Sequence, residues 1–157
     1  MPEGLFGRIL VAIDGSKYAD RATDAAIDLA KKYGAELTVL AVAPVQAVFV
    51  SATEPWVPAE VPESENKAYR EVVEQAVRRC QAAGVAAVTG ICLEGVITDE
   101  IIGHVEKHPT DLLVLGSRGK SAAKRLLLGS VSDAVSHHVT CPVLIVRLGP
   151  DRAPPSA

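Results

Sequence analysis

The feature that most constrains the fold is the alternation of short apolar runs with helical patterns. "RILVAID" at 8–14 and "ELTVLAVA" at 36–43 are nearly continuous apolar runs, typical of strands that a parallel sheet buries on both faces. Further strands are predicted at 86–93, where Gly90 interrupts the run, at 111–116 and at 142–148.

Four helices are predicted between these strands. Ser16 can cap the first, and Gly34 ends it. Its predicted apolar face consists of Ala19, Ala22, Ala26, Leu29 and Tyr33. The second ends at Gly84, and its apolar face consists of Tyr69, Val72, Val73, Ala76, Cys80 and Ala83. The third covers about 97–107, and a short fourth follows at 130–139.

This order predicts a single α/β domain with a parallel sheet and helices on both faces, covering residues 1–148. Residues 44–63, rich in proline, are expected to form a long loop, and 149–157 a flexible tail. In such sheets ligands bind at the carboxyl ends of the strands, where the strand order reverses. Asp14 ends the first strand and Gly116 the fourth, so both are expected at that end.

Composition narrows the function and the compartment. The net charge of -3 carries no broad basic field, so neither nucleic acid nor an anionic membrane is an expected partner. The three cysteines are odd in number and widely spaced, which favours reduced core thiols over disulfides or a zinc site. The first residues lack the pattern of a signal peptide or membrane span, so a cytoplasmic location is expected.

The stretch "GSRGKS" at 116–121 resembles the end of a P-loop, but the match fails. A P-loop needs a glycine five residues before the Gly-Lys pair, and that position is Val114. What remains is Gly116, Gly119 and Gly129, followed by Ser130. Glycines allow close backbone approach, and a helix that opens at Gly129 would offer N–H groups and hydroxyls to an anion. The pattern therefore predicts a di- or triphosphate site.

The same glycine spacing, flanked by "RILVAIDGS", "HPTDLLVLGSRG" and "CPVLIV", is similar to the ATP-binding motif of the universal stress protein family. The likeness covers nearly the whole chain. It implies a Rossmann-like five-stranded parallel sheet of order 3-2-1-4-5. Family members that lack the glycine pattern generally do not hold ATP, so the resemblance implies the ATP-binding branch.

The resemblance also implies the binding residues. Residues matching Ala12 and Val42 wall the adenine, Asp14 lies near the adenosine part, and Gly116 lies by the ribose. The phosphates meet Gly119, Gly129, Ser130 and Ser132. The full implied set is Ala12, Asp14, Val42, Leu115, Gly116, Arg118, Gly119, Gly129, Ser130, Val131 and Ser132. The implied ligand is ATP, with or without Mg²⁺ held by its phosphates.

Simpler interpretations stay open for several residues. Asp14-Gly15 can be an ordinary turn, and Gly129-Ser130 an ordinary helix cap. We expect the basic side chains of 120, 124 and 125 to be solvated rather than phosphate ligands, whereas Arg118 favours a role in the pocket. Both histidine pairs are interpreted as helix ends rather than metal sites: His104 with His108, and His137 with His138. Phe49 and Trp56 can form a lid over the base of the nucleotide, or they can hold the long loop against the body of the protein.

Three function classes follow. The leading one is a nucleotide-binding stress or signalling protein with little or no catalysis, because no general base for an attacking water is evident. The alternatives are a weak ATPase or adenylate-handling enzyme on the same fold, and a scaffold that binds no nucleotide. A homodimer is also expected through the edge strand from Pro142 to Val146, whose apolar run needs a cover. The tail is the alternative cover.

Overall fold

The computed structural model describes residues 4–45, 47–48, 53, 57–58, 60–120 and 128–149. Its main sheet has five strands in the order β5-β2-β1-β6-β7, and all neighbours are parallel. The strands are β1 (Arg8–Ile13), β2 (Glu36–Pro44), β5 (Val88–Gly95), β6 (Leu112–Gly116) and β7 (Val143–Val146). The predicted fold class and the order 3-2-1-4-5 are confirmed.

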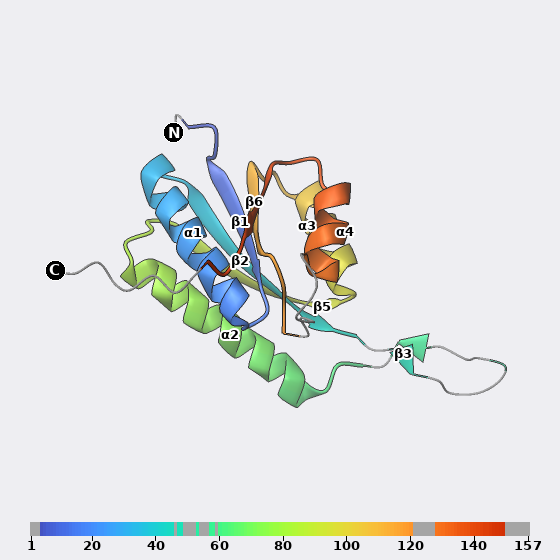
Figure 1. Cartoon of the computed structure of the whole chain (residues 1–157). Coiled ribbons are helices and arrows are strands. Elements are labelled where there is room, and N and C mark those ends of the chain that lie inside the picture. The colour runs from blue at the N-terminus through green and yellow to red at the C-terminus, as the bar shows by residue number, and fades with distance from the viewer. Residues whose placement is uncertain are drawn as a thin grey trace.

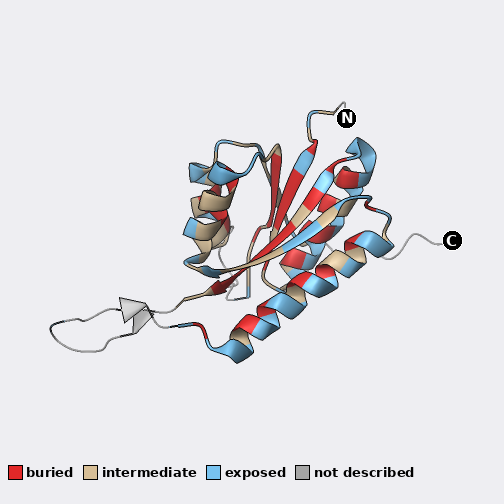
Figure 2. Cartoon of the chain, turned by 180° about the vertical axis from the view of Figure 1, so that it is seen from behind, coloured by how far each residue is buried: buried red, intermediate tan, exposed pale blue. Residues whose placement is uncertain are grey.

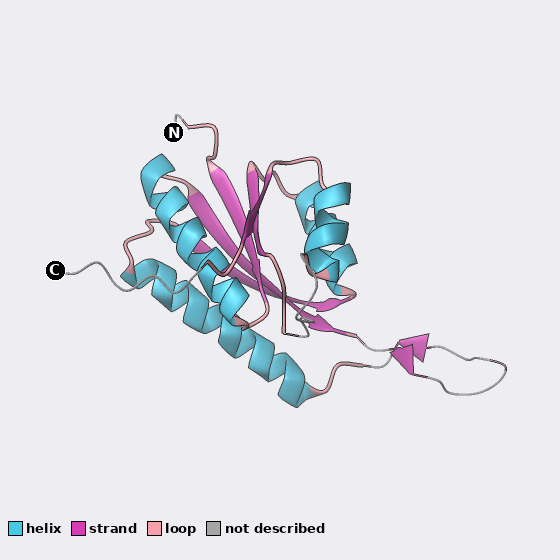
Figure 3. Ribbon diagram, in the orientation of Figure 1, coloured by secondary structure: helices cyan, strands magenta, loops and turns pink. Residues whose placement is uncertain are grey.

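Two helices cover each face of this sheet (Figure 1). On one side lie α1 (Lys17–Tyr33) and α2 (Glu63–Ala82), and on the other α3 (Ile97–Lys107) and α4 (Ser130–His138) (Figure 3). The predicted ends of α1 are correct. Ser16 Oγ accepts the N–H of Ala19 at 3.2 Å, and Gly34 takes the left-handed conformation with φ 60°.

Figure 2 shows the central strands largely in the colour of buried residues. The core has two layers, because side chains alternate along these strands. In β1, Ile9 and Val11 pack with α1 and α2, whereas Leu10 packs in the layer that contains Ile101 and Val135. These strand residues are almost fully buried, as the continuous apolar runs predicted. A sheet covered on both faces leaves its strand ends as the places where a ligand can enter.

The apolar face of α1 differs from the predicted one at its end. Tyr33 is 38% exposed and only makes an edge contact with Phe6, at 5.4 Å between ring centroids. Thr23 is buried instead, because its hydroxyl donates to the carbonyl of Ala19 at 2.8 Å and so needs no water. The predicted apolar face did not include Thr23.

β5 runs from Val88 to Gly95, two residues later at both ends than predicted. Gly90 lies inside the strand and does not interrupt it. A Cβ atom there would lie 2.7 Å from Cγ1 of Val73 in α2, so this glycine lets the helix approach the sheet. The prediction of a weak strand mistook a packing glycine for a break.

Residues 44–63 contain more regular structure than the predicted loop. β2 continues to Pro44, and the short strands β3 (Ala47–Val48) and β4 (Val57–Pro58) pair antiparallel. Figure 1 shows β3 standing apart from the main sheet. Phe49, Trp56, Lys124, Arg125 and the tail from 150 lie outside the described residues.

Within the described part of the chain, no helix is both long and apolar enough to cross a membrane.

Candidate functional site

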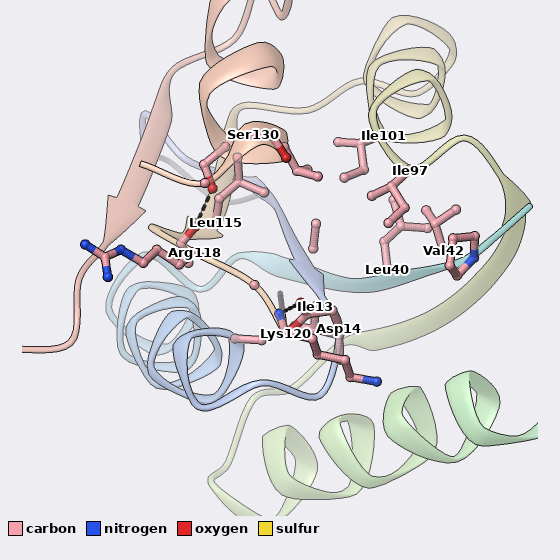
Figure 4. Close-up of a pocket in the computed structure, with 18 of the residues that line it drawn as sticks. Ile13, Asp14, Leu40, Val42, Ile97, Ile101, Leu115, Arg118, Lys120 and Ser130 are labelled. Atoms are coloured by element: carbon pink, nitrogen blue, oxygen red, sulfur yellow. Dashed lines mark hydrogen bonds between the residues drawn. The ribbon is translucent and has the colours of Figure 1, made fainter. Parts of the chain in front are cut away.

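A cavity of about 300 Å³ lies at the carboxyl ends of β1, β2 and β6, beside the first turn of α4 (Figure 4). β1 lies between β2 and β6, so the cavity is at the point where the strand order reverses. All eleven residues of the predicted site line it: Ala12, Asp14, Val42, Leu115, Gly116, Arg118, Gly119, Gly129, Ser130, Val131 and Ser132. Their roles toward a ligand stay a prediction.

One side of the cavity is apolar. Ala12 and Val42 lie there as predicted, together with three residues that sequence reasoning missed: Leu40, Ile97 and Ile101. Leu40 was within reach of the pattern, since it precedes Val42 by two positions and therefore shares its face of β2. The two isoleucines belong to the apolar stripe of α3, which packs against this face. The result is a slot suited to a flat, weakly polar ring.

Asp14 joins the two loops that border the cavity. Its Oδ1 accepts the N–H of Ser16 at 2.9 Å, and its Oδ2 accepts the N–H of Lys120 at 3.0 Å. The first bond is the turn predicted for Asp14-Gly15, and Gly15 has a φ of 85°. The second crosses from the end of β1 to the loop after β6. The carboxylate therefore fixes the shape of the cavity, whatever it does to a ligand.

Gly116 is explained by packing of the protein itself. A Cβ atom at this position would lie 2.9 Å from the backbone carbon and from Cβ of Tyr18 in α1. A side chain would therefore push the first turn of α1 away from β6. Close contact between helix and strand therefore requires glycine here, and the expectation that Gly116 also lies by a ligand stays a prediction.

Gly119 and Gly129 are also restricted by neighbouring protein atoms. A Cβ on Gly119 would lie 2.6 Å from Oδ2 of Asp14, the oxygen that accepts the Lys120 N–H. A Cβ on Gly129 would lie 3.2 Å from the Cα of Arg118, and the Gly129 N–H donates to the carbonyl of Ser117 at 2.6 Å. Each glycine lets two segments of the cavity rim lie side by side.

The first turn of α4 closes the polar side of the cavity. Gly129 is the residue before the helix, and Ser130, Val131 and Ser132 form its first turn. N–H groups in such a turn have no partner within the helix, and the helix dipole favours an anion there. The predicted helix start is correct.

The hydroxyl of Ser132 differs from the prediction. It donates to the carbonyl of Gly116 at 2.6 Å, and Ser132 is buried. A hydroxyl has only one proton to donate, so this one is already used. Ser130, which is exposed, keeps its hydroxyl available.

Lys120 is exposed, as the expectation of a solvated side chain requires, and it also lines the cavity. Its ammonium lies 4.7 Å from the ring centroid of Tyr69, a cation–π contact between the loop after β6 and α2. Tyr69 also lines the cavity and was predicted only as a core residue. Arg118 lines the cavity as expected, although its guanidinium points away from the apolar side chains (Figure 4).

Burial, followed by the charges of Asp14 and Glu65, raises the pKa of Tyr69. The phenol therefore stays protonated at neutral pH. The titratable side chains that line the cavity are then the cations Arg118 and Lys120 and the anion Asp14, with one positive charge in excess. This balance favours an anionic ligand at the polar side.

The remaining candidates lie elsewhere. His137 and His138 occupy the last turn of α4, as predicted, and His104 and His108 lie at the end of α3. In the part of the chain that the structure describes, no group of three His, Cys, Asp or Glu side chains is arranged for a metal ion. Cys80 is buried, whereas Cys92 and Cys141 are half-buried, and burial raises the pKa of all three thiols.

An open parallel sheet with helices on both faces and a cavity at its switch point defines an α/β protein of the doubly wound type. Residues 5–147 match the model of the universal stress protein family. The chain belongs to this family.

Similar proteins agree with this assignment. Universal stress protein YxiE of Bacillus subtilis is 41% identical over 149 residues, which cover 91% of this chain and all of that protein. Among solved structures, universal stress protein UspA from Lactobacillus plantarum shares the fold, with a TM-score of 0.79 and 24% identity over 90% of this chain and 98% of that one. A universal stress protein in complex with cAMP has a TM-score of 0.70 and 26% identity, covering 91% of this chain and 98% of that one.

Proposed function

We propose that the chain binds an adenine nucleotide, ATP, in the cavity at the carboxyl ends of β1, β2 and β6. The observation that carries this proposal is the joining of an apolar slot and a helix N-terminus in one cavity of about 300 Å³. A purine is flat and weakly polar, and its phosphates are strongly anionic. The cavity offers a matching environment to each part.

The apolar side would hold the base. Val42 and Leu40 come from β2, and Ile101 faces them from α3, so a ring can be covered on both faces. These side chains are already buried in the core layer, and their positions are fixed without a ligand. The site is therefore largely preformed, which lowers the entropic cost of binding.

The polar side would hold the phosphates. Backbone N–H groups of Ser130, Val131 and Ser132 are the expected donors, since the hydroxyl proton of Ser132 is already used by Gly116. Lys120 and Arg118 supply positive charge at the same end. A Mg²⁺ ion, where present, would be held by the phosphates.

In this proposal the chain is a nucleotide-dependent stress-response or signalling protein of the cytoplasm, with little or no catalysis. All four histidines are accounted for outside the cavity. The carboxylate of Asp14 accepts two backbone N–H groups and so serves to hold the rim of the cavity together. The bound nucleotide then acts by stabilising one surface of the molecule rather than by reacting.

The first test is identification of the nucleotide released when freshly purified protein is denatured, followed by calorimetric titration with ATP, AMP and cAMP. We expect ATP to be recovered intact and to bind with the highest affinity. Repeated turnover of added ATP and Mg²⁺ would favour the weak ATPase. Tighter binding of cAMP would assign this chain the ligand of the solved relative instead.

The second test is Gly129→Val, which we expect to abolish ATP binding. Its Cβ would lie 3.2 Å from the Cα of Arg118, so the added methyl groups must displace the rim of the polar side. Gly103→Val is the matched control, because no atom lies within 4 Å of a Cβ at Gly103. Circular dichroism tests whether both variants fold. Unchanged ATP affinity in folded Gly129→Val would contradict the phosphate site.

We also propose a homodimer through β7, the segment from Pro142 to Val146. β7 is an edge strand of the sheet, and Leu144 on it is 36% exposed. Leu144→Lys should reduce the mass measured by light scattering from two chains toward one. Leu5→Lys is the control, since Leu5 is 77% exposed but far from β7 in the sequence. A well-folded Leu144→Lys dimer would place the interface elsewhere.

A further inference from the structure

A second, smaller cleft lies at the amino ends of β1 and β2, at the opposite end of the sheet from the large cavity. Its volume is about 80 Å³. Two imidazoles line it: His104 from α3 and His108 from the residue just after this helix. Its other polar lining residues are Arg8, Glu36, Thr38 and Thr110. The adenine nucleotide proposed above uses none of these residues.

The two imidazoles are held together by the backbone. The N–H of His108 donates to the carbonyl of His104 at 2.9 Å, which completes the last helical turn. His108 itself is the residue after α3, in an extended conformation. The ring centroids are 4.3 Å apart and the ring planes differ by 34°. The hydroxyl of Thr110 donates to the carbonyl of His108 at 3.1 Å and fixes the chain just after it.

The side chains of this cleft favour a metal cation over an anion. Imidazole nitrogens are common ligands of transition metals, and both rings line the cleft. The guanidinium of Arg8 lies 3.5 Å from a carboxylate oxygen of Asp111, which offsets its charge, and the same oxygen accepts the backbone N–H of Arg8 at 2.8 Å. Glu36 adds a carboxylate to the lining.

We propose that His104 and His108 together bind one divalent transition-metal ion of the class that prefers imidazole: Zn²⁺, Ni²⁺ or Cu²⁺. Two ligand nitrogens at about 2.0–2.1 Å from one ion lie about 3 Å apart, a spacing that side-chain rotations can reach from the present rings. Water completes the coordination, because no third His, Cys, Asp or Glu joins the pair in the described part of the chain. The cleft, at about 80 Å³, has room for an ion and coordinating water.

The test is calorimetric titration of untagged protein with Ni²⁺ alone at pH 7.5, accompanied by thermal unfolding. Ni²⁺ is chosen because it does not oxidise the free thiols. The protein is untagged because a histidine tag would itself bind Ni²⁺. We expect one Ni²⁺ per chain and a melting temperature that rises with Ni²⁺ concentration. His104→Gln and His108→Gln should each weaken Ni²⁺ binding by at least about tenfold. Changing a residue that only hydrogen-bonds to a metal ligand already costs about that much, and losing the ligand itself should cost no less.

The chain contains its own control pair. His137 and His138 are neighbours in sequence and point in different directions on α4. Nδ1 of His138 lies 2.7 Å from the carbonyl of Ala134, and Nε2 of His137 lies 3.3 Å from Asp133. The double variant His137→Gln/His138→Gln should bind Ni²⁺ like the natural chain.

Two results would overturn the proposal: Ni²⁺ binding that persists in His104→Gln/His108→Gln, or binding that disappears in His137→Gln/His138→Gln. The absence of Ni²⁺ binding to the natural chain would do the same. If His104→Gln fails to fold, His108→Gln still decides, because His108 is exposed and its loss removes no buried contact. Binding of inorganic phosphate that depends on His104 would show the cleft to be an anion site instead.

Discussion

The two sides of the large cavity are built from different parts of the protein. The apolar side consists of core side chains such as Val42 and Ile101, which would be buried with or without a ligand. The polar side consists of backbone segments that lie close together at Gly116, Gly119 and Gly129. A Cβ atom at any of these glycines would displace neighbouring atoms. The apolar side should therefore tolerate conservative changes, whereas the polar side should fail when a single methyl group is added.

The largest effect is expected from Gly116→Ala. The new methyl group would lie 2.9 Å from the backbone carbon of Tyr18, and backbone cannot rotate away as a side chain can. Overpacking of this kind costs about 1–3 kcal/mol of unfolding free energy. Chemical denaturation measures the loss.

The matched control is Gly103→Ala on α3, where a Cβ atom has no neighbour within 4 Å. Alanine in a helix interior is more favourable than glycine by about 0.5–1 kcal/mol, so this variant should gain stability. Equal losses in both variants would mean that glycine is not needed at Gly116 for packing.

Asp14→Ala should follow in size. It leaves the N–H groups of Ser16 and Lys120 without their acceptor, and loss of a charged hydrogen-bond partner costs about 1–3 kcal/mol. ATP affinity should fall as well, because the loop that carries Gly119 is released. Asp28→Ala is the control: its ion pair with Lys32 is exposed and contributes about 0.5 kcal/mol or less. Retained ATP affinity in Asp14→Ala would separate this carboxylate from the site.

Ile101→Val tests the tolerance of the apolar side. It removes one methylene from a buried wall, and such changes cost about 0.5–1.5 kcal/mol. ATP binding, measured by calorimetry, should weaken only slightly, because the slot keeps its shape. A loss of binding as complete as that expected for Gly129→Val would show that the two sides do not differ as described.

The smallest effect concerns pH and extends the comparison to the opposite end of the sheet. The pKa of His104 is lowered in the folded state, so the unfolded chain binds its proton first as pH falls. The resulting stability is present above the pKa of an unfolded histidine and is lost as pH falls through the folded one. With a chelator present, His104→Gln should show a shallower loss of unfolding free energy between pH 7 and pH 5. Identical slopes would contradict a lowered pKa of His104.

The sequence predicted the sheet, its helices and the place of the cavity because these follow from local patterns. Continuous apolar runs identify buried strands, and the glycine spacing is specific to the family. The packing reasons for the glycines could not be predicted. Gly116, for example, contacts Tyr18, a residue far away from it in the sequence. Lys120 and Tyr69 were missed for the same reason: their contact joins segments that no periodicity relates.

The bond from the Lys120 N–H to Asp14 spans 106 positions of the chain. During folding, the two loops that it joins cannot meet until β1 and β6 lie side by side, and closing so long a segment is entropically costly. The cavity rim therefore forms only once these two strands are paired. Since only a chain with this pairing presents the rim, any ligand held there distinguishes such molecules from chains in which the two strands are still apart.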